Sequence, residues 1–355
     1  MNIALQPLVS IVSPVHNEAG HLAECVESIL AQTYQNWDYT IIDNCSTDNS
    51  LEVAHRFASR DQRIRVYQNR RLLKAIPNHN VALRQISPDS KYCKVVFGDD
   101  WIFPHCLEEM VAFAESHPSV GIVGAYALEG KRVAWTGLPY SRSVVPGREI
   151  CRRHLLDGLH VFGSANAVLY RADLVKERDL FYNEANIHAD TEVCFDLLKT
   201  CDFGFVHQVL TYTRVRPDSL SAATTELDTW FSSMLQLLVE HAPDYLTHEE
   251  RDALLARHVK QYYRFLGKSL MLGRDEEFWK YHKSALSKAG IASNRIRLAK
   301  GALETLCLAA LNPGDTVLRM LRSERLRRPG RRTPIPAGKP DALEVKESQN
   351  ASGAA

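Results

Sequence analysis

Several features that define large protein classes are missing from this 355-residue sequence. No stretch of 18 uncharged apolar residues occurs, so we expect no membrane-spanning helix. The first residues lack a basic segment followed by a long apolar run, so we expect no secretory signal peptide. The net charge is only +1, and overall charge therefore does not indicate a nucleic-acid partner. Together these absences predict a cytoplasmic protein that does not bind nucleic acid.

The spacing of the cysteines does not indicate a metal site either. The eight cysteines form no C-x-x-C pair and no zinc-type spacing with histidine. Scattered cysteines in a chain of this length are typical of free, partly buried thiols in a reducing compartment. Hydrophobic content of 45% and charged content of 24% are ordinary for a globular protein with a sizeable core.

What the sequence does contain, in its first third, is a regular alternation of two patterns. Short apolar, β-rich runs lie at residues 8–13, 39–42, 64–67, 92–97 and 120–125. Segments with helical or helix-favouring patterning lie between them at 19–32, 50–58, 78–84 and 104–116. Strands that alternate with short helices predict βαβ units and an α/β fold with a mainly parallel sheet. Ligands of such sheets bind at the carboxyl ends of the strands.

The second half changes character. The pattern weakens from 132 to 163, two further strands are expected at 166–170 and 203–213, and the chain becomes helical from 227. We therefore expect an α/β domain at 1–225, a helical region at 226–328 and a disordered tail at 329–355, which is rich in Gly, Pro, Ser and Ala.

A pair of acids follows the fourth expected strand. Asp99 and Asp100 come directly after the run that ends at Gly98. Two adjacent carboxylates are unfavourable unless a positive group offsets them. A divalent cation that carries a phosphate, Mg²⁺ or Mn²⁺, would do so. The alternative is an ordinary pair of solvated loop acids or helix caps.

Several segments, in order along residues 8–221, resemble the motifs of the family-2 inverting glycosyltransferases. They are Pro14–Glu18 (PVHNE), 28–34 (SILAQTY), 41–48 (IIDNCSTD), Gly98–Asp100, Asp190–Glu192 and 209–214 (VLTYTR). The resemblance implies a GT-A fold, with a Rossmann-like sheet flanked by helices and a C-terminal helical appendage. It also implies sugar transfer, with inversion, from a UDP- or dTDP-sugar to a glycan or lipid-linked acceptor in surface polysaccharide biosynthesis.

By this resemblance, polar groups at the ends of the first two strands meet the nucleotide base and ribose. These positions are Pro14, His16, Asn17, Glu18, Asp43 and Asn44. His16 stands where the family usually has Tyr, and Asn44 replaces the second Asp of a family pair. An amide oxygen still accepts a base N–H, without charge assistance. The alternative for Asp43 and Asn44 is an Asx turn before the next helix.

The same resemblance assigns the acids after the fourth strand. Asp100 is the better metal ligand, while Asp99 holds the ribose or a metal-bound water. Trp101 packs against the sugar or fills the core.

An inverting transfer needs one base that accepts the proton of the acceptor hydroxyl. The resemblance points to Asp190, at the start of a helix expected at 193–198, with Glu192 as the alternative base. Ala189 stands where the family often has Glu. The alternative for Asp190 is an ordinary helix N-cap. Gly163 and Ser164 would line the acceptor pocket or form a structural turn.

Two arginines follow the last strand of the α/β domain. Guanidinium groups match phosphate, so Arg214 and Arg216 are candidates for the donor diphosphate. They are alternatively plain surface residues. Arg216 stands where the family often has His, which removes a third metal ligand.

Two other functions remain open at this stage. A sugar-phosphate nucleotidyltransferase would also be α/β with paired acids, but 13–20 lacks its Gly-rich basic phosphate loop. A catalytically degenerate family member would act as a binding or scaffold subunit, a hypothesis supported only by Asn44, Ala189 and Arg216.

The C-terminal region is strongly basic. Between Arg319 and Arg332 there are seven Arg residues and one acid, Glu324, and the segments 294–311 and 315–326 look amphipathic. Arg-rich amphipathic helices lie well on anionic lipid, so we expect peripheral contact with the inner face of the membrane. The alternative is a helix packed on the domain with a solvated basic face.

Overall fold

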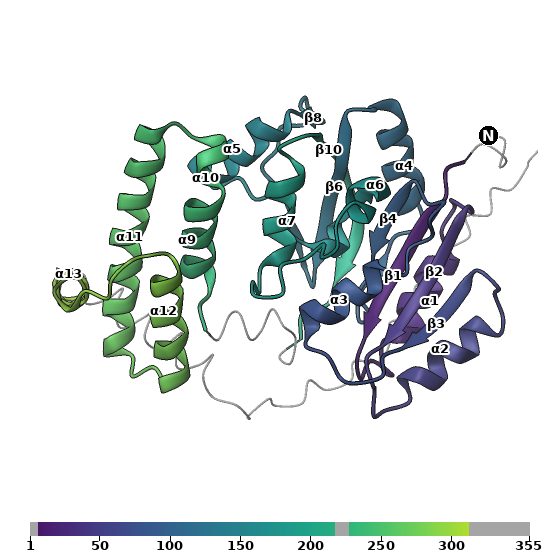
Figure 1. Cartoon of the computed structure of the whole chain (residues 1–355), viewed down its shortest axis with the longest axis horizontal. Coiled ribbons are helices and arrows are strands. Elements are labelled where there is room, and N and C mark those ends of the chain that lie inside the picture. The colour runs from purple at the N-terminus through teal and green to yellow at the C-terminus, as the bar shows by residue number, and fades with distance from the viewer. Residues whose placement is uncertain (1–5, 217–226, 312–355) are drawn as a thin grey trace, which may run out of the picture.

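The computed structural model describes residues 6–216 and 227–311, with side chains up to Cys307. Within these residues the chain forms one mixed sheet flanked by helices, and a helical region beside it (Figure 1). The strands are β1 (Val9–Val15), β2 (Trp37–Asp43), β3 (Ile64–Gln68), β4 (Tyr92–Val95), β5 (Trp101–Ile102), β6 (Val120–Glu129), β7 (Arg132–Ala134), β8 (Val144–Val145), β9 (Val168–Arg171) and β10 (Asp202–Thr213). The helices of this part are α1 (Leu22–Leu30), α2 (Ser50–Ala58), α3 (Ala75–Leu83), α4 (Cys106–Ser116), α5 (Gly147–Asp157), η2 (Ala165–Ala167), α6 (Ala172–Lys176) and α7 (Ala189–Leu197).

The sheet runs in the order β3-β2-β1-β4-β9-β6-β10-β5. Strands β1 to β4 pair in parallel, and β6 pairs in parallel with β10. Strand β9 lies between the two groups and is antiparallel to both β4 and β6. The expected α/β fold is confirmed, but the sheet is mixed rather than mainly parallel, because β5, β7, β8 and β9 pair antiparallel with their neighbours.

Register at the carboxyl edge decides where the site lies. β1 and β2 pair from Val9 with Trp37 to Val15 with Asp43, so both strands end at the same level. β4 joins the other side of β1 and leads into Asp99 and Asp100. The polar residues that follow these three strands therefore meet at one edge of the sheet.

Apolar side chains cover both faces of the sheet, as the alternation along β1 requires. Val9, Ile11 and Val15 pack with α1 and α4 on one face, while Val12 joins the opposite core. Because both faces are covered, β1 is buried along its whole length.

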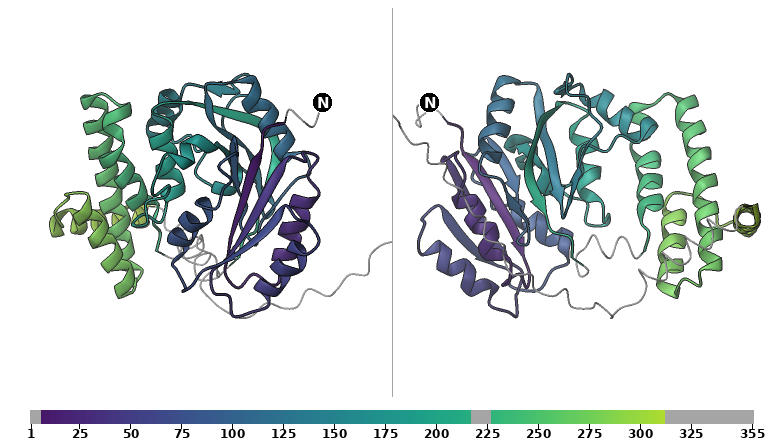
Figure 2. Two further views of the ribbon diagram at one scale, coloured as in Figure 1. Left: turned by 45° about the vertical axis from the view of Figure 1, so that its right-hand side comes forward. Right: turned by 180° about the vertical axis from the view of Figure 1, so that it is seen from behind.

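The C-terminal helices are α9 (Trp230–Glu240), α10 (Ala242–Tyr245), α11 (His248–Met271), α12 (Glu276–Lys288) and α13 (Arg295–Leu311). They lie at the end of the molecule opposite β1–β3 (Figure 2). Leu237 and Tyr245 join the core of the α/β domain, while Tyr262 and Phe278 belong to a separate apolar core between α9, α11 and α12. The helical appendage is thus confirmed as far as residue 311. The expectations for 312–328, for the tail at 329–355 and for the boundary at 225 fall outside the described residues.

Across residues 6–216 and 227–311, none of the helices combines the length and the apolar content needed to span a bilayer. The eight cysteines form no disulfide, as expected, and six of them are buried.

Candidate active site

A cavity of about 680 Å³ lies at the carboxyl edge of the sheet. Most of the residues that the sequence singled out line it. These are Pro14, His16, Asn17, Glu18, Asn44, Asp99, Asp100, Gly163, Ser164, Asp190, Arg214 and Arg216. Asp43, Trp101 and Glu192 do not.

The loop after β1 is tied to the loop after β2. Asn17 has φ of 57°, a left-handed conformation that Asn tolerates better than most residues. Its side-chain oxygen accepts the backbone N–H of Thr47 at 2.8 Å, and its own N–H donates to Ser46 Oγ at 3.0 Å. His16 Nδ1 lies 2.9 Å from the Asn44 carbonyl oxygen. These bonds fix the rim of the cavity before any ligand arrives.

The Asp43 carboxylate faces into the protein rather than into the cavity. It is almost fully buried, and its oxygens accept the N–H of Ser46 at 3.3 and 3.4 Å and the amide of Gln68 at 3.3 Å. The prediction that Asp43 meets the nucleotide directly thus conflicts with its placement. The carboxylate stabilises the turn into α2 instead, close to the alternative of an Asx-type turn.

Asn44 lines the cavity, but its amide is engaged within the chain. The side-chain nitrogen donates to the Leu73 carbonyl and the side-chain oxygen accepts the Leu73 N–H, both at 2.9 Å. The same oxygen accepts from Asn69 Nδ2 at 2.9 Å, and Asn69 reaches Asn78 Oδ1 at 2.8 Å. An ionised Asp in this place could accept the Leu73 N–H but could not donate to the Leu73 carbonyl, whereas the amide of Asn does both. The replacement of a family Asp by Asn44 therefore has a local reason, which is the anchoring of the Leu73 loop.

Three carboxylates and one guanidinium gather where β4 and β10 end. Arg216 contacts both Glu18 oxygens at 2.7 Å and Asp99 Oδ2 at 3.1 Å. Burial raises the pKa of Glu18 above its usual value, against the opposing effect of Arg216. Burial, and then the charge of Asp99, raise the pKa of Asp100 to about 8.

Arg214 holds these acids from the last strand. Its backbone N–H donates to Asp100 Oδ1 at 2.8 Å, and its Nε donates to the Asp99 carbonyl at 3.0 Å. Its guanidinium also pairs with Glu24. The side chains of Arg214 and Arg216 are only 24% and 19% exposed. Both therefore belong to the cavity wall, and neither is a plain surface residue.

The acids fit a divalent cation on chemical grounds. Asp100 is 2% exposed and is costly to ionise as it stands, because its neighbour Asp99 is also an acid. A hard cation prefers carboxylate oxygens and would offset this cost. Within the described residues, three ligating side chains converge only at Glu192, Glu240 and His241, a cluster outside the cavity lining.

Asp190 lies in the first turn of α7. The helix begins at Ala189, four residues earlier than expected, and His188 is its N-cap residue. Burial raises the pKa of Asp190 to about 7, partly offset by the Thr191 N–H, which donates to its carboxylate at 2.8 Å. Across the described chain, no ion pair or side-chain hydrogen bond engages this carboxylate. It is a lone acid in a cavity wall with a pKa suited to proton transfer.

Glu192, the alternative base, is positioned differently. Its oxygens accept hydrogen bonds from Asn183 at 3.0 Å and Asn186 at 2.7 Å. Burial would raise its pKa, but hydrogen bonds from His241, Asn183 and Asn186 outweigh burial and lower it. Because it is bonded on both oxygens and lies outside the lining, its placement does not suit a base that meets the acceptor.

Trp101 also lies away from the cavity. In β5 it stacks on Tyr212 with ring centroids 4.7 Å apart, and it meets Phe103 edge-on at the same distance. This placement does not suit contact with the sugar, and Trp101 is half-buried and belongs to neither core of the α/β domain.

The structure adds residues that the sequence did not indicate. His79 lines the cavity next to Phe97 and Tyr182, and burial lowers its pKa to about 4. Lys94, in the middle of β4, is fully buried and donates to the carbonyls of Asn166 in η2 and of Val168 at the start of β9. No local pattern marks either residue, because both depend on which strands lie next to each other.

A second cavity of about 470 Å³ adjoins the first. Trp135, Gly163 and His188 line both. The other residues that line the second cavity come from α5, the segment before η2, α7, the segment before α9, and α9; they are His154, His160, Phe162, Thr191, Asp228, Thr229, Trp230, Ser233, Met234 and Leu237.

Two polar groups of this second cavity lack partners. His154 is 2% exposed, and its Nδ1 has no hydrogen-bond partner among the described residues. The same holds for Nε1 of Trp135, which has φ of 62°. A bulky residue in the left-handed region is strained, and such strain clusters at functional sites.

Comparisons with known proteins show what the chain resembles. Residues 10–178 match the family model described as "Glycosyl transferase family 2". EpsE of Bacillus subtilis (strain 168) is 37% identical over 119 residues, which cover 33% of this chain and 42% of EpsE. The chain thus spans about two fifths of that relative's length.

Solved structures share the fold. TarS 1-349 of S. aureus, crystallised with UDP-GlcNAc, matches with a TM-score of 0.60 at 19% identity and covers 80% of each chain. The mannosyltransferase PcManGT of Pyrobaculum calidifontis, in complex with GDP-Man and Mn²⁺, matches with a TM-score of 0.51 at 16% identity, covering 91% of this chain and 82% of that one. Residues 10–178 are therefore similar to the glycosyltransferase family 2 model, and the chain has a GT-A-type α/β fold with C-terminal helices.

Proposed function

We propose that the protein is an inverting glycosyltransferase that moves a sugar from a UDP- or dTDP-sugar to a hydroxyl of a glycan or lipid-linked acceptor in surface polysaccharide biosynthesis. One observation carries the proposal. A lone carboxylate with a pKa of about 7, Asp190, lines the same cavity as the paired acids Asp99 and Asp100. An inverting transfer needs one base on the acceptor side and a charge-neutralising site on the donor side, and this cavity holds both elements.

On the donor side, the rim formed by Pro14, His16 and Asn17 receives the nucleoside. Arg214 and Arg216 lie close enough to the acids to contact both the acids and a diphosphate. Asp100 and Asp99 would hold Mg²⁺ or Mn²⁺. Such a cation, when bound, neutralises charge on the leaving nucleoside diphosphate. The Mn²⁺ in the PcManGT complex is consistent with this assignment.

On the acceptor side, Asp190 accepts the proton of the attacking hydroxyl. A carboxylate with a pKa near 7 is deprotonated in a large fraction of molecules at neutral pH and is still basic enough to accept a proton. Its bond from the Thr191 N–H fixes one oxygen and leaves the other for the substrate. His188, whose Nε2 lies 2.8 Å from Thr229 Oγ1, holds the start of α7 against the segment before α9.

The second cavity would receive the acceptor. Among the residues that the structure describes, none of those lining it is Lys or Arg, so this lining does not suit a phosphate. Trp135 and Trp230 offer aromatic rings to a sugar ring, and Thr191, Thr229 and Ser233 offer hydroxyl groups to its hydroxyls. The acceptor moiety that reaches Asp190 is therefore an uncharged sugar unit.

A thermal-shift panel of UDP-, dTDP- and GDP-sugars, with and without Mn²⁺, tests the donor site. We expect stabilisation by one nucleotide class only when Mn²⁺ is present. Asp100→Asn should abolish this shift, whereas Asp89→Asn, which removes the same charge from an exposed loop, should leave it unchanged.

The product identifies the reaction. Release of a nucleoside diphosphate from a nucleotide-sugar in the presence of an acceptor glycan supports the proposed transfer. Release of pyrophosphate when a nucleoside triphosphate and a sugar phosphate are supplied instead would assign the chain to the nucleotidyltransferases. A folded protein that binds no donor in any form would point to the scaffold function instead.

A further inference from the structure

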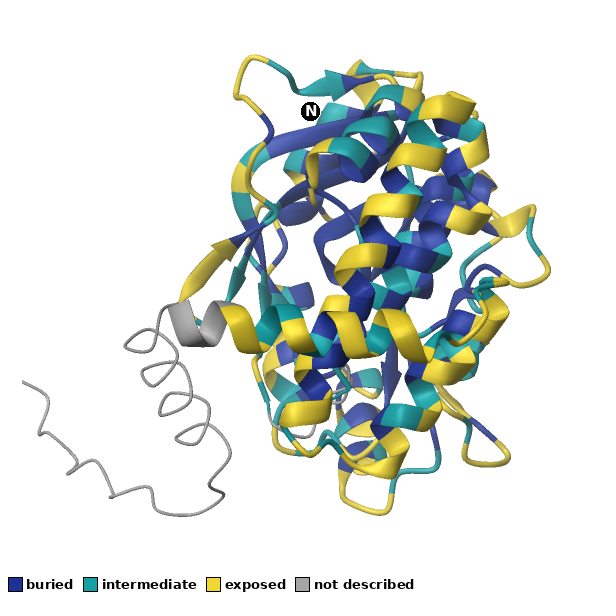
Figure 3. Ribbon diagram, turned by 90° about the vertical axis from the view of Figure 1, so that its left-hand side faces the viewer, coloured by how far each residue is buried: buried dark blue, intermediate teal, exposed yellow. Residues whose placement is uncertain are grey.

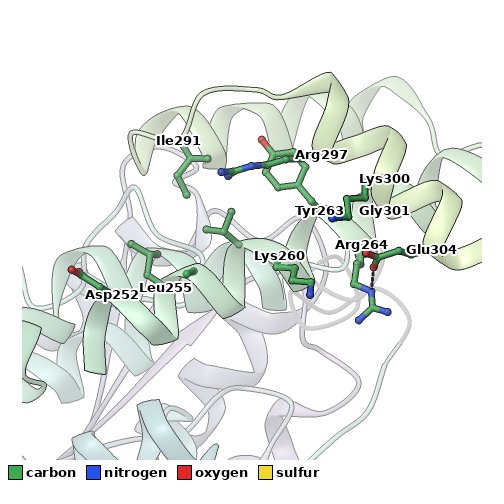
Figure 4. Close-up of a pocket in the computed structure, with 12 residues that line it drawn as sticks. Asp252, Leu255, Lys260, Tyr263, Arg264, Ile291, Arg297, Lys300, Gly301 and Glu304 are labelled. Carbon is green, nitrogen blue, oxygen red and sulfur yellow. Dashed lines mark ion pairs between the residues drawn. The ribbon is translucent and has the colours of Figure 1, made fainter. Parts of the chain in front are cut away.

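A groove of about 480 Å³ lies between α11 and α13, far from the active-site cavity (Figure 4). Its floor is apolar. The floor is formed by Leu255, Val259 and Tyr263 of α11 and by Ile291, which lies in the loop between α12 and α13. The Tyr263 hydroxyl donates to the Ala292 carbonyl at 3.0 Å, which holds the loop in place.

Basic side chains line the same groove. Lys260, Arg297 and Lys300 enter no ion pair with the described residues, whereas Arg264 pairs with Glu304 at 2.6 Å. The only other acid in the lining is Asp252. The groove therefore carries an uncompensated positive charge above an apolar floor.

Much of helix α13 is exposed to solvent (Figure 3), including several of its aliphatic residues. The face of α13 that packs on α11 carries a residue without a side chain, Gly301. A Cβ at Gly301 would lie 2.4 Å from the Tyr263 carbonyl oxygen, so α13 crosses α11 in backbone contact. Outward, Ile296, Leu303 and Leu306 are 80%, 61% and 51% exposed. Their spacing of seven and three residues places them along one side of the helix.

An exposed aliphatic stripe beside unpaired cations is costly in water and suits an anionic lipid surface. Aliphatic side chains enter the acyl boundary, and Lys and Arg interact with phosphate headgroups. The charge of the groove favours this occupant over a neutral protein partner. The sequence that follows α13 adds seven Arg and one Glu between Arg319 and Arg332, which is the same sign of charge.

We propose that the exposed face of α13 docks on an anionic lipid bilayer, with a headgroup phosphate in the groove lined by Lys260, Arg297 and Lys300. This inference is independent of the glycosyltransferase proposal, since it rests on α11 and α13 alone. It turns the expected peripheral membrane contact into a defined surface.

Co-sedimentation of the full chain with vesicles tests the proposal. At low salt the protein should sediment with phosphatidylcholine vesicles that contain about a third phosphatidylglycerol, and not with pure phosphatidylcholine. Lys260→Gln/Lys300→Gln should lower the partition coefficient by roughly 30-fold, since each cation near an anionic surface contributes about a fivefold effect. Leu303→Ser/Leu306→Ser should also lower it, because the stripe no longer enters the lipid.

A matched control removes the same charge from the other end of the molecule. Arg56→Gln/Arg60→Gln changes two exposed residues in and after α2 and should leave sedimentation unchanged. If Lys260→Gln/Lys300→Gln sediments with the vesicles as strongly as the wild type does, the proposal is wrong. So would a dimer in solution that Leu303→Ser/Leu306→Ser dissociates without any vesicle binding. Stabilisation by inorganic phosphate without sedimentation would reassign the groove to a soluble anion. All of these experiments measure binding, so the outcome of a transferase assay would not change how they are interpreted.

Discussion

Replacement of Asp190 by Asn should lower activity and raise stability at the same time. Burial raises the pKa of Asp190 from 3.8 to about 7, so ionisation of this carboxyl is unfavourable in the folded state. A shift of about 3 units corresponds to roughly 4 kcal/mol. The unfolded chain holds fewer protons than the folded chain between these two pKa values, so folding stability falls as pH rises through this window.

The amide of the Asp190→Asn variant is uncharged at every pH, so this unfavourable free energy of ionisation is absent. Its amide oxygen can still accept the Thr191 N–H that the carboxylate now accepts at 2.8 Å. At pH 8 we expect Asp190→Asn to be more stable than the wild type by up to about 4 kcal/mol, and at pH 3 to 4 the difference should vanish. Urea denaturation of the two proteins at both pH values measures it, with Asp89→Asn as the control that should show no such gain.

Activity should move in the opposite direction. Loss of a general base typically lowers turnover by ~10²–10⁴-fold. For the wild type, kcat/KM should rise about tenfold between pH 6 and pH 8, as a base with a pKa near 7 deprotonates. Asp100, with a pKa of about 8, could produce a similar limb, but that limb would move to lower pH as Mn²⁺ is raised. A variant that is less stable at pH 8, or that keeps the pH limb, would refute the assignment of Asp190.

Three further substitutions test the local structure. Asn44→Asp removes the donor to the Leu73 carbonyl and should cost about 1–3 kcal/mol in urea denaturation; unchanged stability would contradict the pairing. Gly163→Ala places a Cβ 2.2 Å from Thr191 Oγ1 at φ of +111° and should lower Tm and turnover, with partial recovery in Gly163→Ala/Thr191→Ala. Lys94→Met removes the amine that donates to the buried carbonyls of Asn166 and Val168 and should cost about 1–3 kcal/mol; an equally stable variant would show that the Lys94 amine is dispensable.

The carboxyl edge of the sheet could be predicted because the pattern there is local. Each strand is an apolar run that ends in polar residues, so the positions of Glu18, Asp99 and Asp100 at one edge follow from parallel pairing. Arg214 and Arg216 follow in the same way from the end of β10. The antiparallel insertion of β9 could not be predicted, since strand order depends on contacts between distant segments and not on periodicity.

The directions of side chains were the other feature that the sequence could not predict. The sequence places Asp43 and Asn44 at a strand end but does not reveal that Asp43 turns inward or that Asn44 pairs with Leu73, 29 residues away. The start of α7 was missed for a related reason. Asn183 and Asn186, which look like loop residues, bond to Glu192 and allow the helix to begin earlier.

The pairing of Asn44 with Leu73 also bears on how this site can change over generations. A single substitution to Asp would restore the family's usual pair of acids, yet it would break the bond that holds the loop at one side of the cavity. Residue 44 and the segment around Leu73 are therefore epistatic: a substitution in one of them lowers stability unless the other changes too. Exchange of donor loops between relatives should succeed only when residue 44 and the segment around Leu73 are transplanted together.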